Sequence, residues 1–136
     1  MKVGDYEIPD DLFYSREHEW ARKINETVEL GVTDYAQKQL KDVVFIELPD
    51  PDTSIEANEV FGAIESVKAV NDLFAPLSGR VVAKNEELED QPELANEDPY
   101  GTGWLIRIEP SKFDEEWDSL MSATDYAALI EELEND

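Results

Sequence analysis

Short apolar runs separated by polar pairs or prolines constrain the fold of this chain more than any other feature. Residues 18–24 and 27–32 are two such runs, and the Asn25-Glu26 pair between them suits a hairpin turn. Residues 43–48 (VVFIEL) have the composition of a buried strand. The prolines at positions 49 and 51 end this run, because proline cannot donate a hydrogen bond to a strand ladder. The first half of the chain is therefore predicted to form mostly strands.

A lysine stands between two further strand-like runs in the middle of the chain. Residues 60–65 and 70–75 face each other across a short turn, with Lys68 at or beside its tip. A second pair, residues 79–83 and 104–108, is separated by a long polar connection rich in Glu and Pro. The order strand, acidic loop, strand occurs on both sides of the lysine hairpin. This weak quasi-repeat predicts two small sheets related by a pseudo-twofold axis.

Residues suited to helix N-termini mark three short helices. Thr33 is a good N-cap for a helix that follows it directly. Ser111, with Asp114 three residues later, resembles a capping box. Thr124 can cap a last helix, whose apolar stripe we expect to pack on the sheets as core rather than bind a partner: Tyr126, Leu129, Ile130 and Leu133.

The chain is strongly acidic, with 34 acidic and 11 basic side chains in 136 residues and a formal net charge of −23. Such a surface repels nucleic-acid phosphates and anionic lipids, so we expect neither nucleic acid nor a membrane as partner. The acids are spread along the chain, which favours a halophilic protein whose self-repulsion is screened by salt over an ordinary acidic one. No apolar leader is visible, and a single cytoplasmic domain over residues 1–136 is expected, with residues 111–136 as a C-terminal helical segment.

Catalysis by the chain's own side chains is poorly supported. There is no cysteine, which excludes disulfides, thiolate nucleophiles and Cys-based metal sites, and the lone histidine, His18, cannot form a multi-histidine site. Asp50, Asp52 and Glu56 lack the spacing of a calcium-binding loop, so no metal is expected. From spacing alone, a solvated surface residue is the favoured interpretation of Lys68.

Several segments match the pattern of one known family in order along the chain. The segment around the lysine is Glu65-Ser66-Val67-Lys68-Ala69, and the other matching segments are 15–20 (SREHEW), 31–37 (GVTDYAQ), 42–49 (DVVFIELP), 75–79 (APLSG) and 96–105 (NEDPYGTGWL). Together they resemble the H-protein of the glycine cleavage system, with the lipoyl-attachment motif at Lys68. The similarity covers roughly residues 12–133.

This resemblance implies a mainly β fold of the barrel-sandwich hybrid type, with two small antiparallel sheets, a lysine-bearing hairpin and short helices outside. It implies a non-catalytic, monomeric carrier with lipoic acid in amide linkage to Lys68, so that the sulfur chemistry belongs to the cofactor. The implied partners are a pyridoxal-phosphate glycine decarboxylase that loads an aminomethyl group and a tetrahydrofolate-dependent aminomethyltransferase that removes it. A dihydrolipoyl dehydrogenase using FAD and NAD would reoxidise the arm, and a lipoylating enzyme would attach it.

The same resemblance implies further site residues. Matched position by position, Glu19 and Asp72 would contact the cationic amine of the loaded arm, and ordinary surface acids are the alternative interpretation. Glu65 is either a recognition residue for the lipoylating enzyme or a solvated turn acid. Glu17 and Tyr35 depart from the family, since other members have a small polar residue and a histidine at these positions, which leaves the docking surfaces open.

Three alternative functions are considered beside this one. A lipoyl or biotinyl domain of another complex shares the lysine hairpin, but those carriers typically show Asp-Lys-Ala or Met-Lys-Met where this chain has Val67 and Ala69 around the lysine. A relay protein that donates lipoyl groups to other complexes would share the whole motif. An unmodified acidic interaction protein would carry no cofactor and would bind basic partners in a salt-sensitive way.

Overall fold

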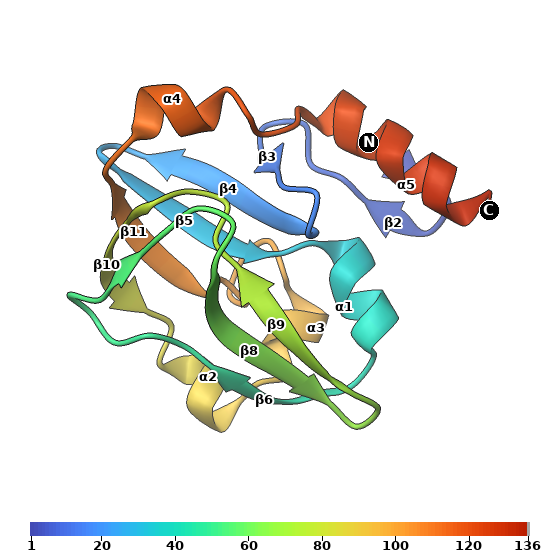
Figure 1. Ribbon diagram of the computed structural model, residues 1–136. Helices are drawn as coiled ribbons and strands as arrows, with labels where there is room; N and C mark the ends of the chain where they lie inside the picture. Colours follow the sequence, from blue (N-terminus) through green and yellow to red (C-terminus); the bar gives the residue numbers. More distant parts are fainter. Residues whose placement is uncertain (136) are drawn as a thin grey trace.

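The computed structural model describes residues 1–135, which fold into three antiparallel sheets with short helices outside them (Figure 1). The largest sheet has six strands in the order β3-β4-β5-β11-β10-β7. Their bounds are Phe13–Tyr14 (β3), Glu19–Ile24 (β4), Thr27–Val32 (β5), Ile106–Pro110 (β11), Gly79–Lys84 (β10) and Ser54–Ile55 (β7). The predicted hairpin joins β4 to β5, with Asn25 in the left-handed region at φ 57°.

The lysine hairpin belongs to a separate sheet of three strands, in the order β6-β8-β9. Its strands are Val43–Glu47 (β6), Val60–Ser66 (β8) and Val70–Phe74 (β9), and a further small sheet pairs β1 (Lys2–Val3) with β2 (Tyr6–Glu7). The mainly β class is confirmed. The quasi-repeat predicts two small sheets, whereas the structure has one sheet of six strands and one of three. The difference arises because β11 pairs with β5 as well as with β10, which extends one sheet across the molecule.

Two apolar clusters fill the space between the six-stranded and three-stranded sheets. One is built mainly from the larger sheet and includes Val28, Leu30, Val81, Ile106 and Ile108. The other lies under the smaller sheet and includes Ile46, Ile64, Leu73, Leu88 and Leu105. Leu48 and Phe61 pack against both clusters, so the two sheets share a contiguous core and hold the lysine hairpin on a rigid base.

Strand β6 differs from the fully buried strand that its composition predicts. Val43 and Ile46 are buried, but Val44 and Phe45 are 51% and 52% exposed. The pairing with β8 shifts register between Val43 and Phe45, and such a bulge turns neighbouring side chains toward the same side. One face of the strand therefore packs on the core and the other meets solvent.

Helix α1 (Asp34–Leu40) begins as predicted, because the Thr33 hydroxyl accepts the N–H of Ala36 at 3.2 Å. The capping box predicted for Ser111 and Asp114 is wrong. Helix α4 (Phe113–Trp117) starts after Lys112 and has no side-chain cap, while the Ser111 N–H donates to the carbonyl of Ser78.

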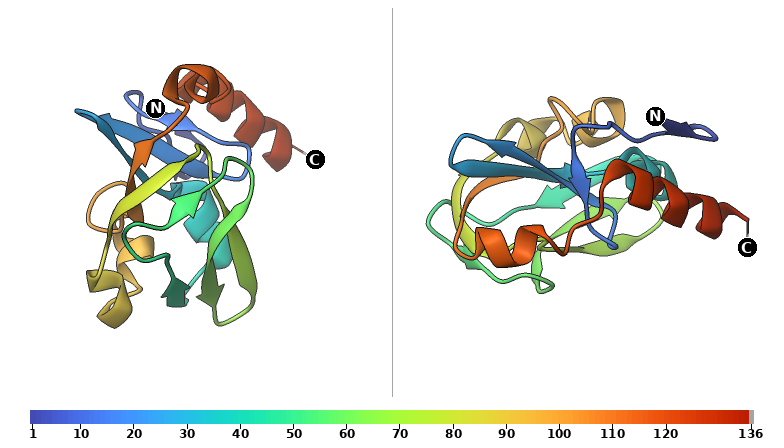
Figure 2. Two further views of the ribbon diagram at one scale, coloured as in Figure 1. Left: turned by 60° about the vertical axis from the view of Figure 1, so that its left-hand side comes forward. Right: turned by 90° about the horizontal axis from the view of Figure 1, so that it is seen from above.

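The last helix, α5 (Ala123–Glu134), is capped by Ser122 rather than Thr124, since the Ser122 hydroxyl accepts the N–H of Asp125 at 3.2 Å. Of its predicted apolar stripe, Tyr126 and Ile130 are fully buried, whereas Leu133 is 40% exposed. The helix therefore packs as core over its first two turns, on the segment that contains β1 and β3. Figure 2 shows α4 and α5 on the outside of the sheets.

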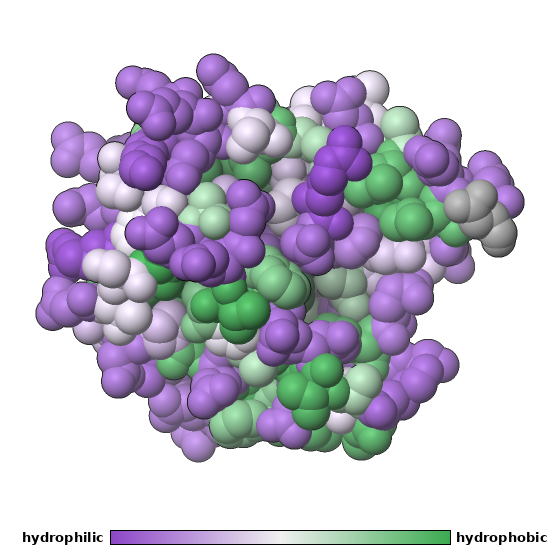
Figure 3. All heavy atoms as spheres, in the orientation of Figure 1, coloured by the Kyte–Doolittle hydropathy of each residue, from purple (hydrophilic) through white to green (hydrophobic). Residues whose placement is uncertain are grey.

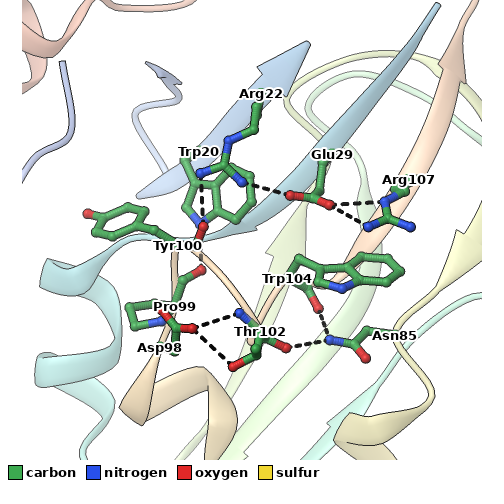
Figure 4. A network of polar contacts seen from close by, with 10 residues as sticks. All are labelled: Trp20, Arg22, Glu29, Asn85, Asp98, Pro99, Tyr100, Thr102, Trp104 and Arg107. Atoms are coloured by element: carbon green, nitrogen blue, oxygen red, sulfur yellow. Dashed lines mark hydrogen bonds and ion pairs between the residues drawn. The ribbon is translucent and has the colours of Figure 1, made fainter. Parts of the chain in front are cut away.

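The long connection between β10 and β11 contains two helical turns, α2 (Glu87–Asp90) and α3 (Leu94–Glu97), and is fixed by side-chain hydrogen bonds (Figure 4). The Asn85 amide donates to the carbonyls of Thr102 and Trp104, both at 2.8 Å. The Trp20 indole N–H donates to the carbonyl of Pro99 at 2.9 Å. The connection between β10 and β11, predicted only as a polar loop, is thus an ordered segment that covers part of the six-stranded sheet.

Arg22 joins this cover to the six-stranded sheet and also pairs with a buried carboxylate, Glu29. Glu29 is 4% exposed and accepts from Arg22 at 2.8 Å and from Arg107 at 2.9 Å, and these residues lie side by side on β4, β5 and β11 (Figure 4). Arg22 also donates to the carbonyl of Tyr100 at 2.9 Å. Two of the few arginines of the chain therefore serve the fold, because a buried carboxylate needs paired donors.

The lysine hairpin and the C-terminal helices lie at opposite ends of the molecule (Figures 1 and 2). In Figure 1 the turn between β8 and β9 is at the lower end, and α4 and α5 are along the top. No helix within residues 1–135 combines the length and the apolar character needed to cross a bilayer.

Candidate functional site

The turn that carries Lys68 is organised by one hydroxyl group. Ser66 ends β8 and is 8% exposed, and its Oγ accepts the N–H groups of Lys68 and Ala69, both at 3.2 Å. The Ser66 N–H donates to the carbonyl of Ala69 at 2.8 Å, which closes the turn. The sequence predicts the hairpin but not this role of Ser66. A serine whose hydroxyl can bond backbone N–H groups two and three residues later is the signal that could have indicated it.

The turn is also fastened to the neighbouring strand. The Val67 N–H donates to the carbonyl of Asp42 at 3.2 Å, and Ser66 pairs with Val43 at the start of β6. Lys68 itself is exposed. The structure therefore presents a single lysine side chain to solvent from a backbone that is held on both sides, which is the arrangement that a covalently attached arm needs in order to move from a fixed base.

A cleft of about 500 Å³ lies beside this hairpin, along the edge strand β9. All five residues of β9 line it, and most of the rest of the wall comes from α1 and from the segment that leads into β4. The lining residues outside β9 are Glu17, His18, Glu19, Val32, Tyr35, Ala36, Gln39, Leu40 and Ile64. Among the described residues that line the cleft there are three carboxylates and neither Lys nor Arg. The cleft therefore suits an apolar chain that carries a positive charge.

Glu19 is buried in the wall of this cleft at 3% exposure. Its Oε2 accepts the N–H of Phe74 at 2.9 Å, which covers the free edge of β9. Burial raises the pKa of Glu19 well above its usual value of 4.5, and the charge of Glu17 raises it further, against the lowering effect of the Phe74 hydrogen bond. Burial therefore makes the ionised form of the Glu19 carboxyl unfavourable in free energy unless a cation lies beside it.

Asp72, the other predicted contact, lies on β9 and is exposed. It pairs with Ala63 on β8 and lines the same cleft as Glu19. Lys68 stands four residues before Asp72 along the chain and is not part of the cleft wall. The structure therefore brings Glu19 and Asp72 to one cleft, with the attachment point at its end rather than inside it.

His18 also lines the cleft, and its role in the structure is not evident from the sequence. Its backbone is left-handed at φ 67°, and its Nδ1 lies 2.9 Å from the hydroxyl of Tyr126, which in turn lies 2.8 Å from the hydroxyl of Thr33. Burial lowers the pKa of His18, so the ring is kept neutral more readily than a free imidazole. The imidazole thus ties the cleft to α5, and the sequence contains no local signal for a partner this far along the chain.

Two of the three acidic residues considered for calcium form ion pairs with basic side chains. Asp50 lies 2.8 Å from Lys84, and Asp52 lies 2.5 Å from Arg80. In the part of the chain that the structure describes, no group of three or more His, Asp or Glu side chains is placed to hold a metal ion.

Comparisons with known proteins identify the family. Residues 12–133 match the family described as "Glycine cleavage H-protein". The chain is 52% identical over 128 residues to the "Glycine cleavage system H protein" of Anaeromyxobacter sp. (strain K), covering 94% of this chain and 99% of that protein. It is 46% identical over 134 residues to the "Probable glycine cleavage system H protein" of Pyrococcus abyssi (strain GE5 / Orsay), covering 98% and 99% of the two chains.

A solved structure agrees with these sequence matches. The crystal structure of a glycine cleavage system H protein from Mycobacterium marinum superposes with a TM-score of 0.81 at 35% identity, covering 90% of this chain and 98% of that one. The resemblance inferred from the lysine motif is thereby confirmed. The chain belongs to the glycine cleavage H-protein family, the non-catalytic carrier components of the glycine cleavage system.

Proposed function

We propose that Lys68 of this chain carries lipoic acid in amide linkage and serves the glycine cleavage system as its mobile arm. The observation that carries this proposal is a single exposed lysine on a turn fixed by Ser66, in a chain that matches the family over residues 12–133. When bound, the lipoyl group supplies the sulfur chemistry by which an aminomethyl group is accepted and released. The protein supplies the fixed base, the cleft and the surfaces that partners recognise.

The cleft would hold the loaded end of the arm through Glu19 and Asp72. The lining from β9 and α1 offers apolar contact to the chain of the arm, and the carboxylates face its cationic amine. A cation beside Glu19 favours the ionised carboxylate and offsets the desolvation that raises its pKa. The exposed Asp72 adds charge at the entrance. Enclosure of the amine among these groups would limit its contact with water.

The partners follow from this role as expectations. We infer successive encounters with a pyridoxal-phosphate glycine decarboxylase, a tetrahydrofolate-dependent aminomethyltransferase and a dihydrolipoyl dehydrogenase that uses FAD and NAD, after a lipoylating enzyme has modified Lys68. The acidic surface favours basic docking sites on these enzymes. We also infer that residues 1–136 act as one domain, since one contiguous core joins the two larger sheets. We expect this domain to be monomeric and cytoplasmic. Coincident unfolding curves by circular dichroism and tryptophan fluorescence would support the single domain, and two separate transitions would contradict it.

The acidic surface leads to a further expectation, a protein adapted to high salt. The net charge of −23 leaves most carboxylates without a basic partner, and their mutual repulsion weakens as the Debye length falls to about 3 Å in 1 M salt. We expect the melting temperature to rise with KCl concentration. A melting temperature that falls as KCl is added would contradict this expectation.

The proposed function is tested by the intact mass of the protein purified from its own host, followed by peptide mapping around Lys68. We expect the mass increment of one lipoyl amide, located on Lys68. In the variant Lys68→Arg the increment should be absent while the circular dichroism spectrum is unchanged, because the side chain is exposed. The matched control Lys2→Arg changes another exposed lysine and should keep the increment. Unmodified Lys68 in cells grown on glycine would contradict the proposal and favour the acidic interaction protein.

A further inference from the structure

Exposed apolar side chains surround the base of Lys68. Val67 is 70% exposed, Val70 63%, Phe45 52% and Val44 51%, and we call these four residues the hairpin collar. Eight large apolar side chains are exposed within residues 1–135, and half of them belong to this collar. Figure 3 shows green surface at the lower end of the molecule, where the β8–β9 turn lies in Figure 1, as well as green areas elsewhere on this face. Apolar residues scattered singly over a surface are ordinary, but a cluster around a reactive group indicates a contact surface.

The strand register places two members of the collar in one row of the sheet, on either side of Glu65. Phe45 on β6 pairs with Glu65 on β8, and Glu65 pairs with Val70 on β9, so the three side chains form one row on the outer face of the sheet. The Val67 N–H bond to Asp42 holds the turn against the start of β6. Two elements far apart in sequence therefore build one small apolar surface beside the lysine.

Acidic side chains lie within this surface and beside it. Glu65 stands within the row, and Glu47 and Asp72 flank Ala63 in the next row of the sheet. A partner that fits the collar would therefore present an apolar lip surrounded by Lys and Arg. Charge complementarity of this kind mainly accelerates the encounter, while apolar contact holds the complex.

We propose that the hairpin collar is the docking surface for the enzyme that attaches the acyl cofactor to Lys68, an inference that rests on the proposed function. The argument is one of reach. An unmodified lysine extends only about 6 Å from its Cα to its Nζ, so the enzyme must bring its acyl group that close to the hairpin backbone. Enzymes that later meet the modified arm have the added length of the cofactor and are under no such constraint.

The chemistry of attachment defines the partner class. The unprotonated Nζ of Lys68 attacks the carbonyl carbon of an activated acyl donor, either an acyl adenylate or a thioester. The new C–N bond forms as the adenylate or thiolate leaves with its bonding electron pair, and the nitrogen releases one proton to solvent. No electron donor or acceptor is needed. The attaching enzyme must hold this long apolar acyl group in a channel. The mouth of such a channel is apolar, which matches the apolar side chains of the collar.

The collar is tested by the double variant V67A/V70A, with V60A as the matched control. Val60 is 53% exposed on the same strand pair but lies at the other end of β8, about 20 Å from the turn. Each variant is incubated with a purified ATP-dependent lipoate ligase, lipoic acid and ATP, and kcat/KM is measured by intact mass. We expect V67A/V70A to lose about tenfold per valine, since each truncation removes two methyl groups that the ligase would cover. V60A should match the wild type.

Each other outcome has a defined meaning. Equal rates for V67A/V70A and the wild type would overturn the collar, and equal losses in V60A and V67A/V70A would overturn it by showing a general effect on the strands. A wild-type dimer in sedimentation that V67A/V70A abolishes, with unchanged lipoylation, would assign the surface to a second copy of the chain instead. Failure of the wild-type chain to accept lipoate on Lys68 at all would refute the proposed function, which is a distinct result from a selective loss in V67A/V70A.

Discussion

The hairpin end and the opposite end of this molecule use apolar residues in contrary ways. At the hairpin, Val67 and Val70 are more than half exposed. At the other end, Tyr14, Trp20 and Tyr126 are each 0% exposed, and the rings of Tyr14 and Tyr126 stack with centroids 4.5 Å apart. We refer to these three residues as the aromatic cluster. The contrast indicates that the stability of the fold comes from the aromatic cluster and the sheets, which leaves the hairpin free to present its side chains to partners.

This division predicts that changes at the two ends separate stability from carrier function. The largest effect is expected for Gly31→Ala, beside the aromatic cluster. Gly31 pairs with Trp20 across β4 and β5, and a Cβ at this position would lie 2.4 Å from the indole ring. Displacing a buried tryptophan that also donates to the carbonyl of Pro99 should cost about 3 kcal/mol or more of unfolding free energy. Urea denaturation followed by tryptophan fluorescence measures this cost.

Gly4→Ala is the control for Gly31→Ala. Gly4 has φ 58°, and a Cβ added to it would meet no atom within 4 Å, so alanine there meets backbone strain without a steric clash. The cost should be about 1 kcal/mol. Equal costs for the two glycines would contradict the view that close approach of the Trp20 ring selects glycine at position 31.

A smaller loss is expected from Tyr126→Phe, which removes one hydroxyl from the aromatic cluster. This hydroxyl bonds both His18 and Thr33 in a buried position, and its loss leaves both without that partner. The cost should be about 2 kcal/mol of unfolding free energy. The rate of lipoate attachment to Lys68 should stay at the wild-type value, because the hairpin lies at the far end of the molecule. If fully folded Tyr126→Phe accepted lipoate on Lys68 more slowly than the wild type, the proposed separation of stability from carrier function would be contradicted.

The matching deletion at the hairpin, Ser66→Ala, should have the reverse profile. It removes the acceptor of the Lys68 and Ala69 N–H groups, but these residues are exposed and water can replace the bond. The unfolding free energy should fall by about 1 kcal/mol or less. Hydrogen exchange at the Lys68 and Ala69 amides should accelerate, and lipoate attachment should slow. Ser119→Ala, which removes another exposed hydroxyl, is the control and should leave both rates unchanged.

The two ends also differ in how far the sequence predicts them. The hairpin, its lysine and the two carboxylates of the cleft could be predicted, because a turn between two apolar runs and a family motif are local features. The aromatic cluster could not, since Tyr126 meets His18 and Thr33 across more than ninety residues of chain. The same reason explains the errors at β6 and at the cap of α4. A bulge exposes Val44 and Phe45, and tertiary bonding takes Ser111 out of its predicted cap.

The last prediction concerns Glu19, whose carboxylate accepts the Phe74 N–H at the end of β9 away from the Lys68 turn. Its pKa is raised by burial above the usual 4.5, so the folded protein keeps this proton to higher pH than the unfolded chain does. The proton therefore stabilises the fold at low pH, and that contribution is lost as pH rises from about 4.5 through the raised pKa.

Glu19→Gln removes the titration while its amide oxygen can still accept from Phe74. Its unfolding free energy relative to the wild type should increase between pH 4 and pH 8, as measured by urea denaturation in constant high salt. Glu26→Gln removes an exposed charge in the β4–β5 turn and controls for general repulsion. A difference between Glu19→Gln and the wild type that stays constant with pH, or that follows Glu26→Gln, would show that Glu19 titrates as an ordinary surface acid.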